Sequence, residues 1–151
     1  MSKDNEIEAL IELLETTQND YTLRIAAESL EKIGTGNPKA IEGLIKVLET
    51  TQNVSFLWIA VESLEKIGTG NPKAIEALIK VLETSQNLCI LWIAVAALEK
   101  IGTGNPKAIE ALIKVLETTQ NDDIRNLAAQ SLEKIGTGNP KAIEALFKEW
   151  E

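Results

Sequence analysis

The apolar positions of residues 38–50 recur at the spacing of a single helical face. They are Ala40, Ile41, Leu44, Ile45 and Leu48. Steps of three and four residues place side chains on one side of an α-helix. The pattern therefore predicts a helix over 38–50 (helix A), and a second apolar segment predicts another helix over 54–67 (helix B). The sequence has no alternating run of β-branched residues that would favour a sheet.

This pair of helices is repeated along the chain with a fixed period. The segment GTGNPKAIE begins at Gly34, Gly68, Gly102 and Gly136, always 34 residues apart. Such a period is typical of a solenoid, in which each unit buries its apolar face by stacking on its neighbours. The sequence therefore predicts an all-α α-solenoid of nine helices. We expect a single domain over 1–151, with repeats at about 2–35, 36–69, 70–103 and 104–137 and a C-terminal capping helix over 138–151.

The junctions between helices carry residues that end one helix and start the next. Gly34 is expected to take the left-handed conformation that often closes a helix. Asn37 is expected to cap the following helix, with Pro38 at its first position. On the solvent side of that helix, Glu42 and Lys46 lie four residues apart, which predicts an ion pair along the helix.

The ends of the array differ from its middle. Ser2 or Asp4 is expected to cap the first helix. Near the C-terminus, Phe147 and Trp150 take the places of smaller aliphatic residues. We expect these two rings to cover an end that has no following B helix in this sequence.

Helix B carries two apolar sides in the middle repeats. One side, which includes Ile59, Ala60 and Leu64, keeps its character in every copy and is assigned to the core. The other side is apolar only in repeats two and three. There it consists of Val54, Leu57, Trp58 and Val61 in one copy, and of Leu88, Leu91, Trp92 and Val95 in the next.

The outer repeats hold polar residues at several of the same positions. Arg24 and Asn126 stand where the middle repeats have tryptophan, and Asp20 and Asp122 stand where they have Val54 and Leu88. The fold therefore does not require apolar residues there. A helix that is apolar all round is often simply buried. The period favours the other interpretation, a surface ladder with Trp58 beside Trp92, because equivalent solenoid positions have equivalent surroundings.

Charge and composition narrow the classes of partner. The chain has 15 Lys plus Arg against 23 Asp plus Glu, a formal charge of −8. This argues against nucleic acid, whose phosphates need a basic surface, and against anionic membranes. The N-terminal residues lack the features of a signal peptide, and there is one cysteine, Cys89. We expect a cytoplasmic protein, or a recombinant one without a native compartment.

The sequence offers no convincing catalytic, cofactor or metal site. It contains no histidine, the commonest general base and metal ligand. The GTGNPK segments follow helices rather than strands and lack the spacing of a phosphate-binding loop. Cys89 has no histidine to activate it. We therefore expect a protein that is not an enzyme, without cofactor or metal.

The junction KIGTGNPKAI and the alanine pairs of helix B, Ala26-Ala27 and Ala128-Ala129, resemble HEAT-like repeats of the short type found in phycobilin lyases. The similarity covers essentially the whole chain and implies the fold far more than a function. The framework is almost invariant while one face varies. In this respect the chain is similar to engineered, consensus-derived HEAT-like repeat proteins, in which a de novo scaffold displays chosen residues on helix B.

These observations lead to three hypotheses for the function. The first is a protein-binding scaffold with Trp58 and Trp92 as anchors and a polar rim made by Arg24, Glu28, Arg125 and Gln130. The second is homodimerisation through the same apolar face. The third, binding of a small apolar ligand between the tryptophans, is weaker because no polar group is placed to orient a ligand.

Overall fold

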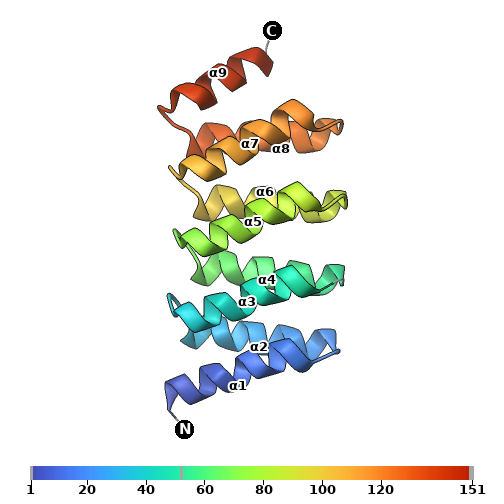
Figure 1. The fold of residues 1–151 in the computed structure, drawn as a ribbon, viewed down its shortest axis with the longest axis vertical. Helices are drawn as coiled ribbons and strands as arrows, with labels where there is room; N and C mark the ends of the chain where they lie inside the picture. Colours follow the sequence, from blue (N-terminus) through green and yellow to red (C-terminus); the bar gives the residue numbers. More distant parts are fainter. Residues whose placement is uncertain (1, 52, 150–151) are drawn as a thin grey trace. The chain divides into compact units, whose positions relative to one another are not determined.

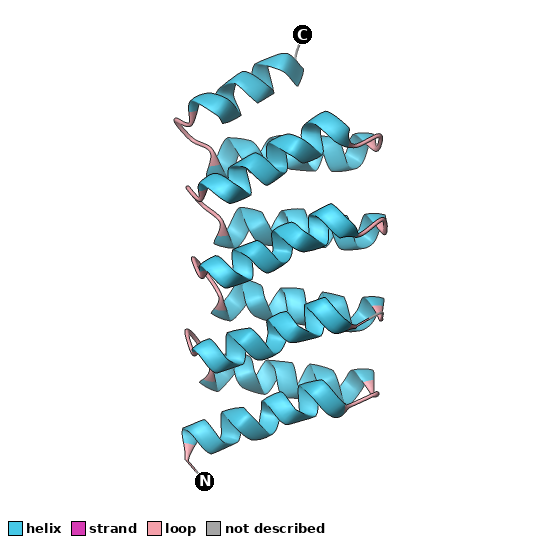
Figure 2. Cartoon of the chain, in the orientation of Figure 1, coloured by secondary structure: helices cyan, strands magenta, loops and turns pink. Residues whose placement is uncertain are grey.

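The computed structural model describes residues 2–51 and 53–149, and this part of the chain folds into nine α-helices without a strand (Figures 1 and 2). The all-α prediction is confirmed. The helices are α1 (Lys3–Thr16), α2 (Asp20–Ile33), α3 (Pro38–Thr50), α4 (Val54–Ile67), α5 (Pro72–Thr84), α6 (Leu88–Ile101), α7 (Pro106–Thr118), α8 (Asp122–Ile135) and α9 (Pro140–Glu149). Odd-numbered helices correspond to helix A of the repeat, and even-numbered ones to helix B.

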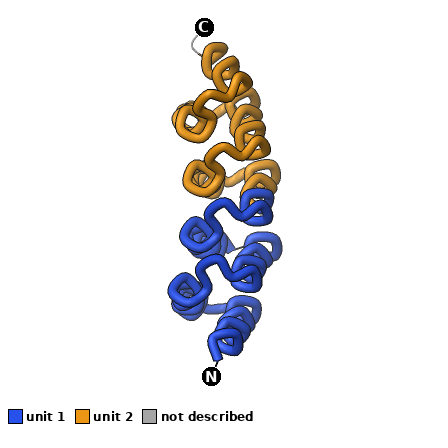
Figure 3. The backbone as a smooth tube through the Cα atoms, turned by 90° about the vertical axis from the view of Figure 1, so that its left-hand side faces the viewer, with its two compact units in different colours: residues 1–77 blue, residues 78–151 orange. Residues whose placement is uncertain are grey.

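The chain divides into two compact units, residues 1–77 and 78–151, and the division falls inside α5 (Figure 3). In the first unit, α1 packs on α3 and α2 packs on α4, so the A and B helices form two layers. In the second unit, α6 packs on α8, and α9 packs on both α7 and α8. Each unit therefore has the layered helix pairs of an α-solenoid, as the sequence predicts.

Asparagine side chains start most of the helices, as expected. The Asn37 side-chain oxygen accepts hydrogen bonds from the backbone N–H groups of Lys39 and Ala40, at 2.9 and 3.1 Å. Ser2 caps α1 in the same way, accepting from the backbone N–H of Asn5 at 3.2 Å. These bonds satisfy donors that the first turn of a helix leaves free.

The left-handed glycine of each junction is the second one, so the expectation for Gly34 is wrong. Gly34 has φ −108°, whereas Gly36 has φ +73°. Gly34 is needed for a different reason, because a Cβ atom there would lie 2.7 Å from the backbone oxygen of Leu30. The junction thus uses one glycine for close packing and the other for its backbone conformation.

The core consists of leucines and alanines at equivalent places in successive repeats. Leu30, Leu44 and Leu64 are completely buried in the first unit, and Leu98, Leu112 and Leu132 in the second. The small Ala60 and Ala128 are also buried. The side of helix B assigned to the core is therefore confirmed for Ile59, Ala60 and Leu64.

The C-terminal helix does not bury its aromatic residue. Phe147 is 61% exposed, so the expectation that it covers the end is wrong. Ile143 on the same helix is 45% exposed, although its counterpart Ile109 in α7 is 3% exposed. Ile109 belongs to a repeat whose own B helix, α8, packs on α7. Trp150, the other ring of this prediction, lies outside the described residues.

Candidate binding surface on the B helices

Four of the predicted binding residues are exposed and form one stripe in each unit. The α4 stripe consists of Val54 and Trp58, which are 41% and 51% exposed. The α6 stripe consists of Leu88 and Trp92, which are 51% and 46% exposed. Within each stripe the two residues are four apart and therefore share a helical face. The stripes lie in different units, so the side-by-side arrangement of Trp58 and Trp92 stays a prediction.

Two predicted binding residues are not on the surface. Val61 and Val95 are 1% and 0% exposed, so the prediction that they belong to an outer face is wrong. Their counterpart in the first repeat, Ala27, is buried as well. The error arises because Val61 lies between the two apolar sides of its helix, where periodicity alone does not decide between core and surface.

Leu57 and Leu91 are half-buried, and their counterpart in the last repeat shows what this position contacts. That counterpart is Arg125, whose Nε lies 3.4 Å from Glu149 on α9. Its Nη2 atom donates a 2.8 Å hydrogen bond to the backbone oxygen of Thr119. In the last repeat this position therefore faces the turn and the next A helix, and a place for Leu57 and Leu91 in a binding surface stays a prediction.

The residues expected to form a polar rim also divide into exposed and half-buried ones. Arg24, Glu28 and Gln130 are exposed and remain available at the surface. Arg125 is half-buried and held by the contacts described above, together with a 2.7 Å ion pair from its Nη1 to Asp122. Arg125 therefore helps to hold α9, and its contribution to a binding rim stays a prediction.

Polar contacts between repeats are a feature that the sequence interpretation missed. Lys39 on α3 pairs with Glu8 on α1 at 3.1 Å, and Lys46 pairs with Glu15 at 3.7 Å. Glu42 pairs with Lys73, at 2.9 Å, and not with Lys46 as predicted. Each Lys39-type pair joins residues 31 apart in sequence. Because this separation is constant, the repeat sequence itself could have predicted these ion pairs between repeats.

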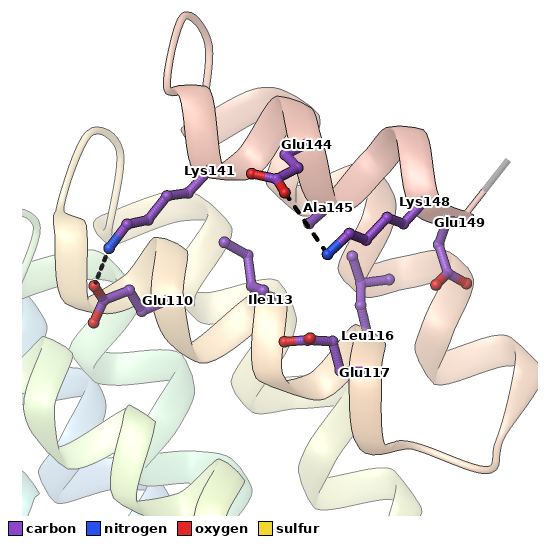
Figure 4. A pocket seen from close by; sticks show the side chains of 9 residues that line it. All are labelled: Glu110, Ile113, Leu116, Glu117, Lys141, Glu144, Ala145, Lys148 and Glu149. Atoms are coloured by element: carbon purple, nitrogen blue, oxygen red, sulfur yellow. Dashed lines mark hydrogen bonds and ion pairs between the residues drawn. The ribbon is translucent and has the colours of Figure 1, made fainter. Parts of the chain in front are cut away.

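Three hollows of the described surface are lined by no residue of either stripe. One of about 340 Å³, in the second unit, lies between α7 and α9 (Figure 4). Three of its four carboxylates have cationic partners: Glu110 pairs with Lys141, Glu144 with Lys148, and Glu149 with Arg125. The other two, of about 490 and 400 Å³, lie in the first unit and are lined by residues from α1, α2, α3 and α4 and the turns beside them. None of the three includes Trp58 or Trp92.

Comparison with known families settles the class of repeat. The sequence profile of HEAT repeats matches residues 7–99 and 90–148. The chain belongs to the HEAT-repeat family. HEAT repeats are generally scaffolds for protein interaction, and the family is typically non-enzymatic. No curated protein matches the chain.

Two further observations concern membranes and metals. None of the helices in the described ranges 2–51 and 53–149 is long and apolar enough to cross a bilayer. The same ranges hold no cluster of three or more metal-ligating side chains.

Proposed function

We propose that this HEAT-repeat chain is a non-enzymatic scaffold that binds a protein partner through the α4 and α6 stripes. The observation that carries the proposal is that Trp58 and Trp92 are about half exposed. The helices that carry them have other residues that are buried in the core. A tryptophan buries about 150–250 Å² when it is covered. Such rings are the residue type that most often dominates binding energy in protein interfaces.

The contrast with the outer repeats supports the proposal. Arg24 and Asn126, which take the place of the tryptophans, are both exposed. The same backbone position therefore folds with a polar side chain in one helix of each unit. The repeat fold therefore does not require an indole at this position, which favours a role in recognition.

A second copy of the chain is the alternative partner. Two copies, each with a formal charge of −8, repel one another at low ionic strength. This favours a different protein over self-association. Light scattering over a concentration series tests the alternative: a constant monomer mass supports an external partner, and a dimer that disappears in W58S/W92S supports self-assembly.

A peptide-display selection against the full chain tests the proposal directly. Peptides that bind the wild type are re-measured on W58S/W92S, where we expect affinity to fall at least tenfold, since central aromatic anchors carry about 2 kcal/mol or more each. The matched control is L13S/I143S, which removes two apolar residues of similar exposure, 43% and 45%, from the A helices. If the control loses as much affinity as W58S/W92S, the stripes are not the binding surface.

A further inference from the structure

The two exposed tryptophans differ in one chemical respect. The Nε1–H group of Trp58 donates a hydrogen bond to Oε1 of Glu62, one turn further along α4. In α6 the corresponding residue is Ala96, so Trp92 has no carboxylate at that place. The indole of the α4 stripe is therefore hydrogen-bonded to a carboxylate, whereas the indole of the α6 stripe has alanine at the corresponding position.

The charge of Glu62 is not neutralised within the described part of the chain. Lys66 is four residues further on, the usual place for an ion-pair partner on a helix. Its Nζ instead lies 3.4 Å from Glu31 on α2. Arg24, on the neighbouring helix α2, is exposed and makes no ion pair with a described residue. No described residue forms a hydrogen bond or ion pair with the second carboxylate oxygen of Glu62, which is half-buried.

We propose that Trp58 and Glu62 form a subsite for a cationic side chain, a guanidinium or ammonium group, that the partner presents. The face of an indole carries negative charge and attracts cations more strongly than other aromatic rings do. Hydrogen bonding to a carboxylate increases the electron density of the indole, which strengthens this attraction. A planar guanidinium fits the pair best because it stacks on the ring and donates to the free oxygen at the same time.

The inference rests on the proposed function, because it names what the partner places on Trp58. It also separates the two anchors. The cation belongs over Trp58, and an apolar group belongs over Trp92, where Ala96 offers a cation no carboxylate. A partner that matches both stripes therefore carries a basic residue and an apolar residue.

The indole N–H resonances of the full, ¹⁵N-labelled chain provide the test. The probes are N-acetyl-arginine methylamide and N-acetyl-citrulline methylamide, which have nearly the same shape but differ in charge. We expect the Trp58 signal to shift with arginine amide, binding about two- to fivefold tighter than the citrulline compound. The Trp92 signal should respond equally to both probes. Equal responses of Trp58 to both probes overturn the inference.

Two substitutions make the test specific. Glu62→Gln keeps an acceptor for the indole N–H but removes the charge, so the Trp58 response to arginine amide should fall to the citrulline level. Ala96→Glu builds the same pair in α6 and should give Trp92 the preference for arginine. If E62Q keeps the preference, or A96E fails to create it, the inference is wrong.

Arg24 is the competing explanation within the chain. If Arg24→Gln shifts the Trp58 signal without any probe and the wild type shows no preference for arginine, the pair serves Arg24 and the inference is overturned. The probe test and the display selection fail independently. Loss of the arginine preference with retained, tryptophan-dependent peptide binding removes only the cation subsite. Retained arginine preference without tryptophan-dependent peptide binding removes the proposed partner binding and leaves Trp58 and Glu62 as a cation site without a protein partner.

Discussion

The hydroxyl of Ser63 on α4 donates a 2.7 Å hydrogen bond to the carboxylate of Glu31 on α2, the B helix of the preceding repeat. Ser63 is buried, and Lys66 contacts the other oxygen of Glu31. The second unit repeats the arrangement, with Ser131 donating to Glu99 at 3.0 Å and Lys134 lying 2.6 Å from the same carboxylate. A serine, a glutamate and a lysine thus join successive B helices in each unit.

The first prediction concerns the energy of this link. Ser63→Ala should lower the free energy of unfolding by about 1–2 kcal/mol, the range between a neutral hydrogen bond and one to a charged group. The smaller side chain fits, because Ala97 is completely buried at the equivalent place in α6. Urea unfolding measures the difference. The control is Ser29→Ala, at the equivalent, half-buried position of the first repeat. It should change the free energy of unfolding by less than about 0.5 kcal/mol.

The second prediction concerns the response of the same link to acid. Partial burial by itself raises the pKa of Glu99, but hydrogen bonds from Lys134 and Ser131 and the positive charges of Lys134 and Lys100 outweigh it and lower the pKa. A carboxylate with a lowered folded-state pKa stabilises the fold above the ordinary glutamate pKa, about 4.3. That contribution is lost as the pH falls through the folded-state pKa.

Unfolding free energies measured between about pH 6 and pH 3 test this. Glu99→Gln should be less stable than the wild type at pH 6, and the difference should shrink as the pH falls. A difference that is constant over this range would show that Glu99 has the same pKa in the folded and unfolded chain.

Helix positions and the main core were predictable because they depend on local chemistry. Apolar spacing predicts the boundaries 38–50 and 54–67, the Asn-Pro pair supports the first of them, and α3 and α4 occupy these residues. Asn37 caps α3 through contacts within its own first turn. Such features depend on nearest neighbours in sequence, which a single sequence shows directly.

The errors concern contacts between repeats, which local periodicity does not encode. Periodicity leaves Val61 between the core side and the stripe of its helix and so does not decide its burial, whereas the structure buries it. Helical spacing predicts a partner for Lys46 on its own helix, yet Lys46 pairs with Glu15 of the preceding repeat. For Trp58, the polar counterpart Arg24 made the exposed position recognisable from the repeat comparison.

The third prediction distinguishes backbone conformation from packing at the junction. Gly36 has a positive φ, and no heavy atom lies within 4 Å of the place where a Cβ would stand. Gly36→Ala should therefore be destabilising by about 1–2 kcal/mol through backbone strain alone. Gly36→Asn should be less destabilising, since asparagine tolerates the left-handed region better. Thermal melting of the two variants shows which of them is less stable. An equal loss of stability in both would point to a steric cause.

The fourth prediction tests the corrected boundary of the α4 stripe. Val61→Ser places a hydroxyl in the core and removes buried methyl groups, so it should lower the unfolding free energy by about 1–3 kcal/mol. Val54→Ser makes the same chemical change at a position that is 41% exposed and should have an effect below about 0.5 kcal/mol. If the two variants are equally stable, Val61 belongs to the surface stripe after all.

The last prediction separates folding from binding on the same helices. W58S/W92S should keep the helical circular dichroism signal and nearly the wild-type melting temperature, because both rings are about half exposed and the outer repeats fold with Arg24 and Asn126 in their place. Leu64→Ala or Leu98→Ala, each at a completely buried position, should lower the unfolding free energy by about 2–5 kcal/mol through the cavity left behind. Removal of two fully buried tryptophans would lower it by about 3–5 kcal/mol each. A W58S/W92S variant that unfolds, or melts as far below the wild type as the leucine variants, would therefore show that the rings stabilise the fold and are not free for a partner.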